Sequence, residues 1–158
     1  VMPRDLRLSR MLHVLIHLDR HVERATSDQI AGMISTNPVV VRRMMAGLRE
    51  KAILISEKGH GGGWQLARPL EKITLAEIYQ ALGAPTLFAL GCGDEESQCL
   101  MEKAANTATA RALQLASETF ITALSSVTMA DLAVDFEKRL AELGLSPDNL
   151  HHFADQHH

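Results

Sequence analysis

The sequence predicts a mainly α-helical protein with one small β-hairpin and one long helix. Three observations lead to this fold class. Apolar residues recur at helical spacing through the first fifty residues, two short apolar runs flank a glycine-rich turn, and residues 99–125 contain neither Gly nor Pro. The length of 158 residues suits one compact domain with an appendage.

The first two helices are predicted from spacing and capping signals. Leu8, Leu15 and Leu18 lie on one face of a helix predicted over 6–21. A capping box follows, in which Thr26 caps the next helix and Gln29 returns a hydrogen bond to the cap. A short second helix is therefore expected to begin directly after residue 26.

A third helix is predicted over 38–51. Asn37 suits the N-cap, and Pro38 suits the first helical position because the ring fixes a helical φ. A helical wheel places four side chains on one face, which we expect to be core: Val41, Met44, Met45 and Leu48. The opposite face carries Val39, Arg43, Ala46 and Glu50, with Arg42 and Gly47 on its flanks.

A β-hairpin is predicted next, with strands over 53–56 and 64–67. The connecting residues 58–63 hold four glycines and can form only a tight, open turn. The order of helix, helix, turn, helix and hairpin is that of a winged helix-turn-helix. A glycine tip is slim enough to enter the minor groove of DNA.

The second half of the chain is predicted to be helical. Thr74 and Glu77 form another capping box, which opens a helix that ends near residue 82. A loop over 83–98 precedes one long helix over 99–125, and Thr128 caps a last helix that Gly144 ends.

Charge is distributed unevenly along the chain. Residues 1–72 carry 12 Lys and Arg against 7 Asp and Glu, a net charge of +5, whereas residues 73–158 carry 4 against 12, a net charge of −8. A basic front half suits a surface that meets a polyanion. The alternative for the third helix is a solvated face with ordinary surface arginines.

The candidate DNA contacts lie at the second helix, the third helix and the hairpin. An arginine can bind guanine edges or phosphate, and an exposed valine can touch a thymine methyl group. The expected contacts are Thr26, Ser27, Asn37, Pro38, Val39, Val40, Arg42, Arg43, Lys58, His60, Gly61 and Gly62.

Four segments resemble the Rrf2 family of winged-helix transcription regulators, and the run 36–43 is most similar to its YwnA-like branch. The others are 58–69, 73–78 and 125–132, and the similarity extends over residues 6 to 136. It implies a homodimer that binds a roughly palindromic operator in double-stranded DNA, usually as a repressor. It also implies a division into a DNA-binding domain (1–82), a sensor loop (83–98), and a dimerisation helix with C-terminal helices (99–158).

The long helix supports this expectation independently. A helix of that length with apolar residues needs a partner surface. Its apolar and small side chains include Met101, Ala105, Ala108, Leu113, Leu115, Phe120 and Leu124.

The signal to which the regulator responds has three candidate chemistries. Cys92 and Cys99 predict a thiol redox switch, and a helix N-terminus near Cys99 favours the thiolate. A regulator that responds to a small ligand, or to nothing, is the second candidate. An iron–sulfur cluster is the third, although family members that bind one carry three cysteines, and Ala105 stands near the third position.

Other side chains would have to complete such a cluster, because it takes about four ligands. Candidates are Asp5, His13 and His17, the two histidines being spaced i, i+4 on one helix. The histidines are better explained as exposed or interface residues without a ligand role. We therefore expect no cofactor, with the cluster as the alternative.

Several other classes are not expected. No apolar run of about 18 residues marks a membrane span, and the first residues lack an apolar signal-peptide core. Two cysteines suit reduced thiols in the cytoplasm. No nucleophile is paired with a base, so an enzyme is not expected. A protein-interaction module on a degenerate winged helix is the remaining alternative.

Overall fold

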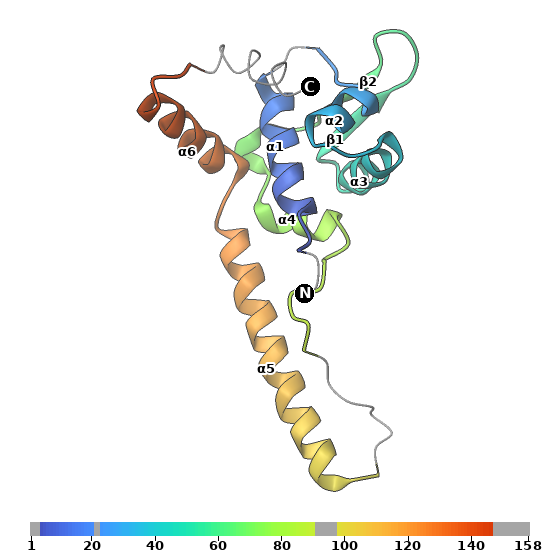
Figure 1. The fold of residues 1–158 in the computed structure, drawn as a ribbon, viewed down its shortest axis with the longest axis vertical. Helices are drawn as coiled ribbons and strands as arrows, with labels where there is room; N and C mark the ends of the chain where they lie inside the picture. The colour runs from blue at the N-terminus through green and yellow to red at the C-terminus, as the bar shows by residue number, and fades with distance from the viewer. Residues whose placement is uncertain (1–3, 21–22, 91–97, 147–158) are drawn as a thin grey trace.

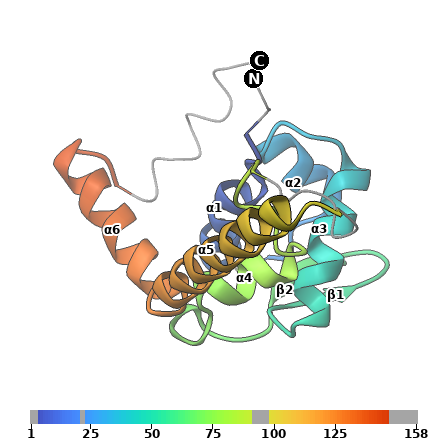
Figure 2. The same ribbon diagram turned by 90° about the horizontal axis from the view of Figure 1, so that it is seen from below.

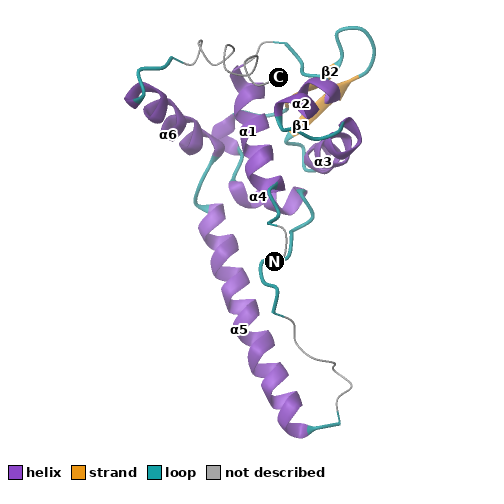
Figure 3. Ribbon diagram, in the orientation of Figure 1, coloured by secondary structure: helices purple, strands orange, loops and turns teal. Residues whose placement is uncertain are grey.

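The computed structural model describes residues 4–20, 23–90 and 98–146. Its elements in chain order are α1 (Arg7–Arg20), α2 (Ser27–Met33), α3 (Pro38–Glu50), β1 (Leu54–Glu57), β2 (Gly63–Leu66), the 3-10 helix η1 (Leu70–Lys72), α4 (Leu75–Ala81), α5 (Leu100–Ser125) and α6 (Met129–Glu142). The first four helices and the hairpin form a head, from which α5 extends as a stalk (Figure 1). The predicted fold class is confirmed (Figure 3).

The predicted N-caps begin their helices as expected. Thr26 accepts from the Gln29 amide at 3.2 Å, and the Gln29 side chain accepts from the Thr26 amide at 2.8 Å. The same reciprocal pair is formed by Thr74 with Glu77 at the start of α4. Each cap satisfies amides that the first helical turn leaves without a partner.

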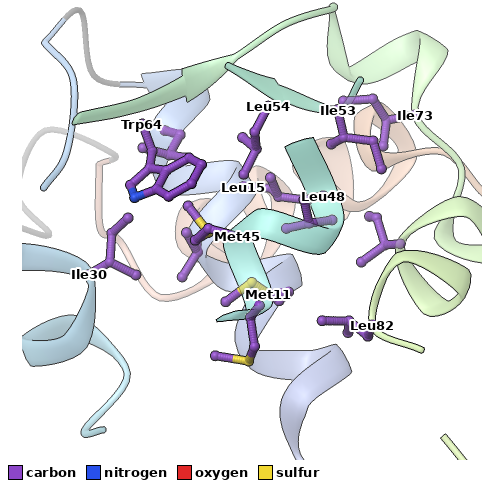
Figure 4. Packing of buried hydrophobic residues seen from close by; sticks show 14 of the residues in the cluster. Met11, Leu15, Ile30, Met45, Leu48, Ile53, Leu54, Trp64, Ile73 and Leu82 are labelled. Carbon is purple, nitrogen blue, oxygen red and sulfur yellow. The ribbon is translucent and has the colours of Figure 1, made fainter. Parts of the chain in front are cut away.

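The core lies between α1, α3, the hairpin and α4 (Figure 4). All four side chains predicted for the inner face of α3 are buried, with exposed fractions of 0 to 7%. Aliphatic and methionine side chains dominate this cluster because the chain holds few aromatic residues. Its largest fully buried members include Met11, Leu15, Ile30, Met45, Leu48, Ile53, Leu54, Ile73, Ile78 and Met129.

The hairpin begins one residue later than predicted. Its strands are antiparallel, with Leu54 opposite Leu66 and Glu57 opposite Gly63. The Ile53 amide donates to the Leu48 carbonyl at 3.0 Å and so closes the end of α3. Ile53 therefore has two roles: its amide closes the end of α3, and its carbonyl accepts from the Ala67 amide at 2.9 Å, next to the ladder that starts at Leu54.

Among the described residues, the C-terminal half of α5 packs against the head. α5 has 26 residues and none of them is buried; its length is about 39 Å. The ring of Phe120 packs edge-on against Tyr79 of α4, with 5.3 Å between centroids. Viewed from below, α6 lies on one side of α5 and the hairpin on the other (Figure 2).

Two short backbone segments join the stalk to the head. Thr74 and Thr128 form an antiparallel bridge, and on either side of it the Leu75 amide donates to Val127 at 3.0 Å and the Met129 amide donates to Ile73 at 2.8 Å. The turn between α5 and α6 is thus fixed against the start of α4. Among the helices described, none is long and apolar enough to cross a membrane.

Candidate nucleic-acid interface

The N-terminal half of α3 presents apolar side chains to solvent. Asn37 accepts a hydrogen bond from the Val40 amide at 3.0 Å, and Pro38 is the first helical residue. Val39 is 62% exposed and Val40 is 37% exposed. Burial of a valine is favourable by about 1.5–3 kcal/mol, so two exposed ones suit a surface that is covered in a complex.

Two arginines extend this surface with positive charge. Arg42 and Arg43 are exposed, and the five ion pairs of the described residues involve neither of them. Arg49, further along α3, lies over the Trp64 ring at 5.9 Å and donates to the Ser56 hydroxyl at 3.3 Å. The guanidinium groups of Arg42 and Arg43 are therefore available to a phosphate or a guanine edge.

The two residues predicted at the start of α2 also have structural roles. The Thr26 hydroxyl caps the helix, and the Ser27 hydroxyl accepts a hydrogen bond from the Trp64 indole at 3.0 Å. Trp64 is only 8% exposed. Since a hydroxyl both accepts and donates, Ser27 keeps a proton that a DNA phosphate can accept.

The tip of the hairpin is thin because glycine is required there. A Cβ atom on Gly62 would lie 2.5 Å from the Glu57 carbonyl oxygen, so no larger residue fits without a backbone shift. Lys58, His60 and Gly61 at the tip are exposed. These residues give an exposed, glycine-rich tip that carries Lys58, as a minor-groove contact would need.

The base of the hairpin is braced against the segment before α2. Ala25 and Trp64 exchange backbone hydrogen bonds of 3.2 and 2.8 Å, and Arg24 binds both carboxylate oxygens of Glu57 at 2.5 and 2.6 Å. Gly63 lies between these contacts with φ +141°, and a Cβ atom there would lie 2.6 Å from the Ala25 oxygen. The hairpin therefore has a defined angle to the helix-turn-helix.

The twelve predicted DNA contacts come from elements on one side of the head. In both ribbon views α2, α3 and the hairpin lie next to one another, on the side away from α6 (Figures 1 and 2). α2 also packs directly against α3. The structure thus brings these segments together, and their contact with DNA stays a prediction.

The predicted sensor residues are less completely placed. Cys99 is exposed and is the N-cap residue of α5, whereas Cys92 lies outside the described residues. His13 is exposed and His17 is half-buried on α1. Among the described residues, no three His, Cys, Asp or Glu side chains gather in a way that could hold a metal ion.

Asp5, another candidate ligand, is engaged by a neighbour. Both of its carboxylate oxygens accept hydrogen bonds from the Arg7 guanidinium, the shortest being 2.6 Å. These bonds hold the pKa of Asp5 below its ordinary value of 3.8. A metal at this carboxylate would have to replace the arginine.

Sequence reasoning misplaced one residue of α3 and missed one outside it. Gly47, predicted at the flank of the exposed face, lies against α4: a Cβ atom there would be 2.2 Å from the Ala81 oxygen. Arg68 was not singled out, yet it donates to three backbone carbonyls and to Glu77. No local pattern marks either role, because each depends on how separate elements pack: Gly47 on α4, and Arg68 on the end of α3 and the start of α4.

Comparison with known proteins places this arrangement in a family. The Rrf2 family model, described as an iron-dependent transcriptional regulator, matches residues 5–135. The chain belongs to the Rrf2 family. The family is one of transcriptional regulators.

Individual Rrf2-type relatives match in sequence or in fold. YwnA of Bacillus subtilis (strain 168), a candidate HTH-type transcriptional regulator, is 40% identical over 78 residues, which are 48% of this chain and 56% of YwnA. The chain thus matches little more than half of that relative's length.

Two solved structures show the same fold. A candidate transcriptional regulator from Lactobacillus plantarum has a TM-score of 0.73 at 24% identity, with coverage of 88% of this chain and 95% of that chain. IscR of T. potens has a TM-score of 0.61 at 18% identity, with coverage of 87% and 90%.

Proposed function

We propose that this Rrf2-family chain is a homodimeric, sequence-specific DNA-binding repressor. α3 lies in the major groove, and the hairpin tip at residues 58–62 enters the adjacent minor groove. The observation that carries the proposal is the start of α3, where exposed Val39 stands with Arg42 and Arg43 beside a braced glycine hairpin. A solvated surface helix would not need exposed valines at that position.

A second copy of the chain is the proposed partner of α5. Leu100, Met101 and Leu115 are 81%, 78% and 56% exposed. A shallow open depression on the same helix is lined by Leu115, Glu118, Thr119, Thr122, Ala123 and Ser126. An isolated amphipathic helix gains most of its stability from packing, so a twin helix in this depression is a favourable arrangement.

The hydroxyl groups of α5 are compatible with burial in such an interface. Six of them donate to the backbone carbonyl four residues earlier, at 2.8–2.9 Å: Thr107, Thr109, Ser117, Thr119, Thr122 and Ser125. A hydroxyl satisfied within its own helix can be buried without leaving an unpaired donor.

Two-fold symmetry of the dimer determines the form of the operator. Two copies of α3 related by a two-fold axis would contact half-sites about 34–36 Å apart, which is one turn of DNA. The operator is therefore roughly palindromic. Repression follows where such a site overlaps a promoter.

For the signal, we propose oxidation of the cysteine thiols. A peroxide oxidises the Cys99 thiol to a sulfenic acid and is itself reduced to water or an alcohol, and condensation with the Cys92 thiol releases water and forms a disulfide. Exposure of Cys99 at the start of α5 supports this step, since the bond would form at the end of the proposed dimer helix.

A small apolar ligand is the second candidate signal. A cavity of about 390 Å³ lies between the end of α4, residues 84–90 and α5, and its walls include Tyr79, Phe88, Leu113 and Ile121. That volume is within the range of about 300–1,000 Å³ typical of ligand sites. The iron–sulfur cluster is the third candidate, and it needs ligands beyond the two cysteines.

DNA binding is tested with an operator selected by the protein from random-sequence duplexes. Arg42→Ala and Arg43→Ala are compared with Arg139→Ala, an exposed arginine of α6 whose ion pair joins it only to Asp135. Replacing an arginine that reads a base should cost about 1–3 kcal/mol of binding free energy, roughly 5- to 150-fold in affinity. Replacing an arginine that contacts phosphate should lower the slope of log affinity against log salt concentration by about one.

Dimerisation is tested by a matched pair of charge substitutions. Leu115→Glu in α5 should give a monomer in sedimentation and weaken operator binding, whereas Leu143→Glu, at a residue 74% exposed just after α6, should do neither.

Binding that does not depend on salt, or equal losses from Arg139→Ala, would contradict the proposed DNA interface. A dimer that survives Leu115→Glu would contradict the proposed use of α5.

A further inference from the structure

Arg68 connects three parts of the fold through one guanidinium group. Its Nε donates to the Ala52 carbonyl at 3.2 Å, and one terminal nitrogen donates to the Lys72 carbonyl at 2.6 Å. The other terminal nitrogen binds Glu77 at 2.9 Å and lies 3.4 Å from the Lys51 carbonyl. The side chain is 27% exposed, so most of it is enclosed by these partners.

The first part is the end of the recognition helix. Lys51 is the C-cap of α3 and Ala52 follows with a positive φ of 54°. The carbonyl groups at a helix C-terminus lack partners within the helix and carry partial negative charge. A half-buried cation at this point donates to the carbonyls of Lys51 and Ala52 and holds the end of α3 in one position.

The second part is the junction between the head and the stalk. Glu77, which receives the ion pair, also accepts from the amide and the hydroxyl of Thr74 at 2.9 and 3.2 Å. Thr74 forms the bridge with Thr128, two residues beyond the C-cap of α5. A continuous series of polar contacts therefore links the end of α3 to the end of the long helix.

We infer that Arg68 is a positioning residue that sets the orientation of the recognition helix relative to α5, and thereby the half-site spacing that the dimer accepts. The inference rests on the proposed dimeric DNA-binding function. If α5 joins the two subunits, the distance between the two copies of α3 depends on the angle between α3 and α5 within each subunit. Arg68 restricts this angle because it binds the end of α3 directly and reaches the end of α5 through Glu77 and the Thr74–Thr128 bridge. No contact with DNA is required of it.

The test measures binding to operators whose half-sites are moved apart or together by one base pair. Each added base pair rotates one half-site by about 34° and shifts it by about 3.4 Å. We expect the wild type to lose at least tenfold in affinity with either change, and Arg68→Met to lose no more than threefold. Arg139→Met on α6 should keep the wild-type penalty.

Two further readouts separate positioning from other roles. Binding of Arg68→Met to a non-operator duplex, and its salt slope, should equal those of the wild type, because Arg68 carries no phosphate contact. Glu77→Gln removes the ion pair while its amide oxygen can still accept from Thr74, so it should relax the spacing penalty partly and serves as the test if Arg68→Met does not fold.

The possible results are distinguishable. If the wild type selects no operator, the proposed function fails. If the wild type shows a spacing penalty and both Arg68→Met and Glu77→Gln retain it in full, the inference about Arg68 is wrong while the proposed function stands. A reduced salt slope for Arg68→Met would also overturn the inference, since it would make Arg68 a phosphate contact.

Discussion

Two helical glycines offer one substitution with opposite expected effects. In an exposed helix interior, Gly→Ala stabilises a protein by about 0.5–1 kcal/mol because alanine loses less backbone entropy on folding. Gly32 in α2 is exposed, and nothing lies within 4 Å of a Cβ atom built there. We therefore expect Gly32→Ala to increase the free energy of unfolding by that amount.

Gly47 in α3 has the same backbone advantage but no room for a side chain. Its Cβ atom would lie 2.2 Å from the Ala81 carbonyl oxygen, 1.2 Å short of the 3.4 Å at which ordinary contact begins. Because the obstacle is backbone of α4, a helix must move, and overpacking of this kind costs about 1–3 kcal/mol. Taking the upper end and subtracting about 1 kcal/mol for entropy leaves a loss of about 2 kcal/mol.

Urea unfolding measures both variants against the wild type. Circular dichroism and Trp64 fluorescence should be recorded at one fixed protein concentration, since dimerisation makes apparent stability depend on concentration. The two alanine variants should differ by about 3 kcal/mol in the free energy of unfolding, or roughly 6–12 °C in Tm for a chain of this size. If Gly47→Ala proved as stabilising as Gly32→Ala, the close approach of α3 and α4 would be refuted.

Three further predictions concern the hairpin, the junction and the signal. Ser27→Ala should lose about 1 kcal/mol by leaving the Trp64 indole unpaired, and a double-mutant cycle with Trp64→Phe should show coupling of similar size; zero coupling would exclude the bond as a contributor. Burial acts to raise the pKa of Glu77, but hydrogen bonds from Thr74 and Arg68 and the charge of Arg68 outweigh it, so this pKa lies below its ordinary 4.5. The contribution of Glu77 to the free energy of unfolding is therefore complete above pH 4.5 and is lost as the pH falls through the lowered pKa. Acid titration of unfolding should therefore be flatter for Glu77→Gln than for the wild type, and equal slopes would contradict the assignment. Protein purified without oxygen should be colourless and should lose operator binding when peroxide is added, and Cys99→Ser should abolish that loss. A visible iron–sulfur absorption band with bound iron, or a full peroxide response in Cys99→Ser, would contradict the proposed thiol signal.

Much of the fold could be predicted because its signals are local. Thr26, Asn37, Thr74 and Thr128 cap helices through atoms only three residues away. The inner face of α3 follows from a period of 3.6 residues, which the backbone imposes on any helix. The hairpin is likewise located by its glycines, and its boundary differs by one residue, with the Ile53 amide bound to the end of α3 and the Ile53 carbonyl bound to Ala67.

The candidate DNA surface was predictable to the same extent. Exposure of Val39, Arg42 and Arg43 follows from the wheel once the buried side is known. The wheel placed Gly47 incorrectly because it cannot show that Ala81 of α4, much later in the chain, packs against that flank. Helical periodicity describes one helix at a time, whereas the exposure of a helix flank depends on which other elements pack against it.

By itself, the sequence determined which segments become α-helices, which faces are apolar and where the glycine hairpin lies, whereas the 3-10 helix η1 was not predicted. Only the tertiary structure decided that Trp64 donates to Ser27, that Glu57 binds Arg24 and that Arg68 joins the ends of α3 and the start of α4. The first set depends on interactions within a few residues of the backbone. The second depends on side chains separated by up to 37 positions, whose meeting is fixed only when the core has packed.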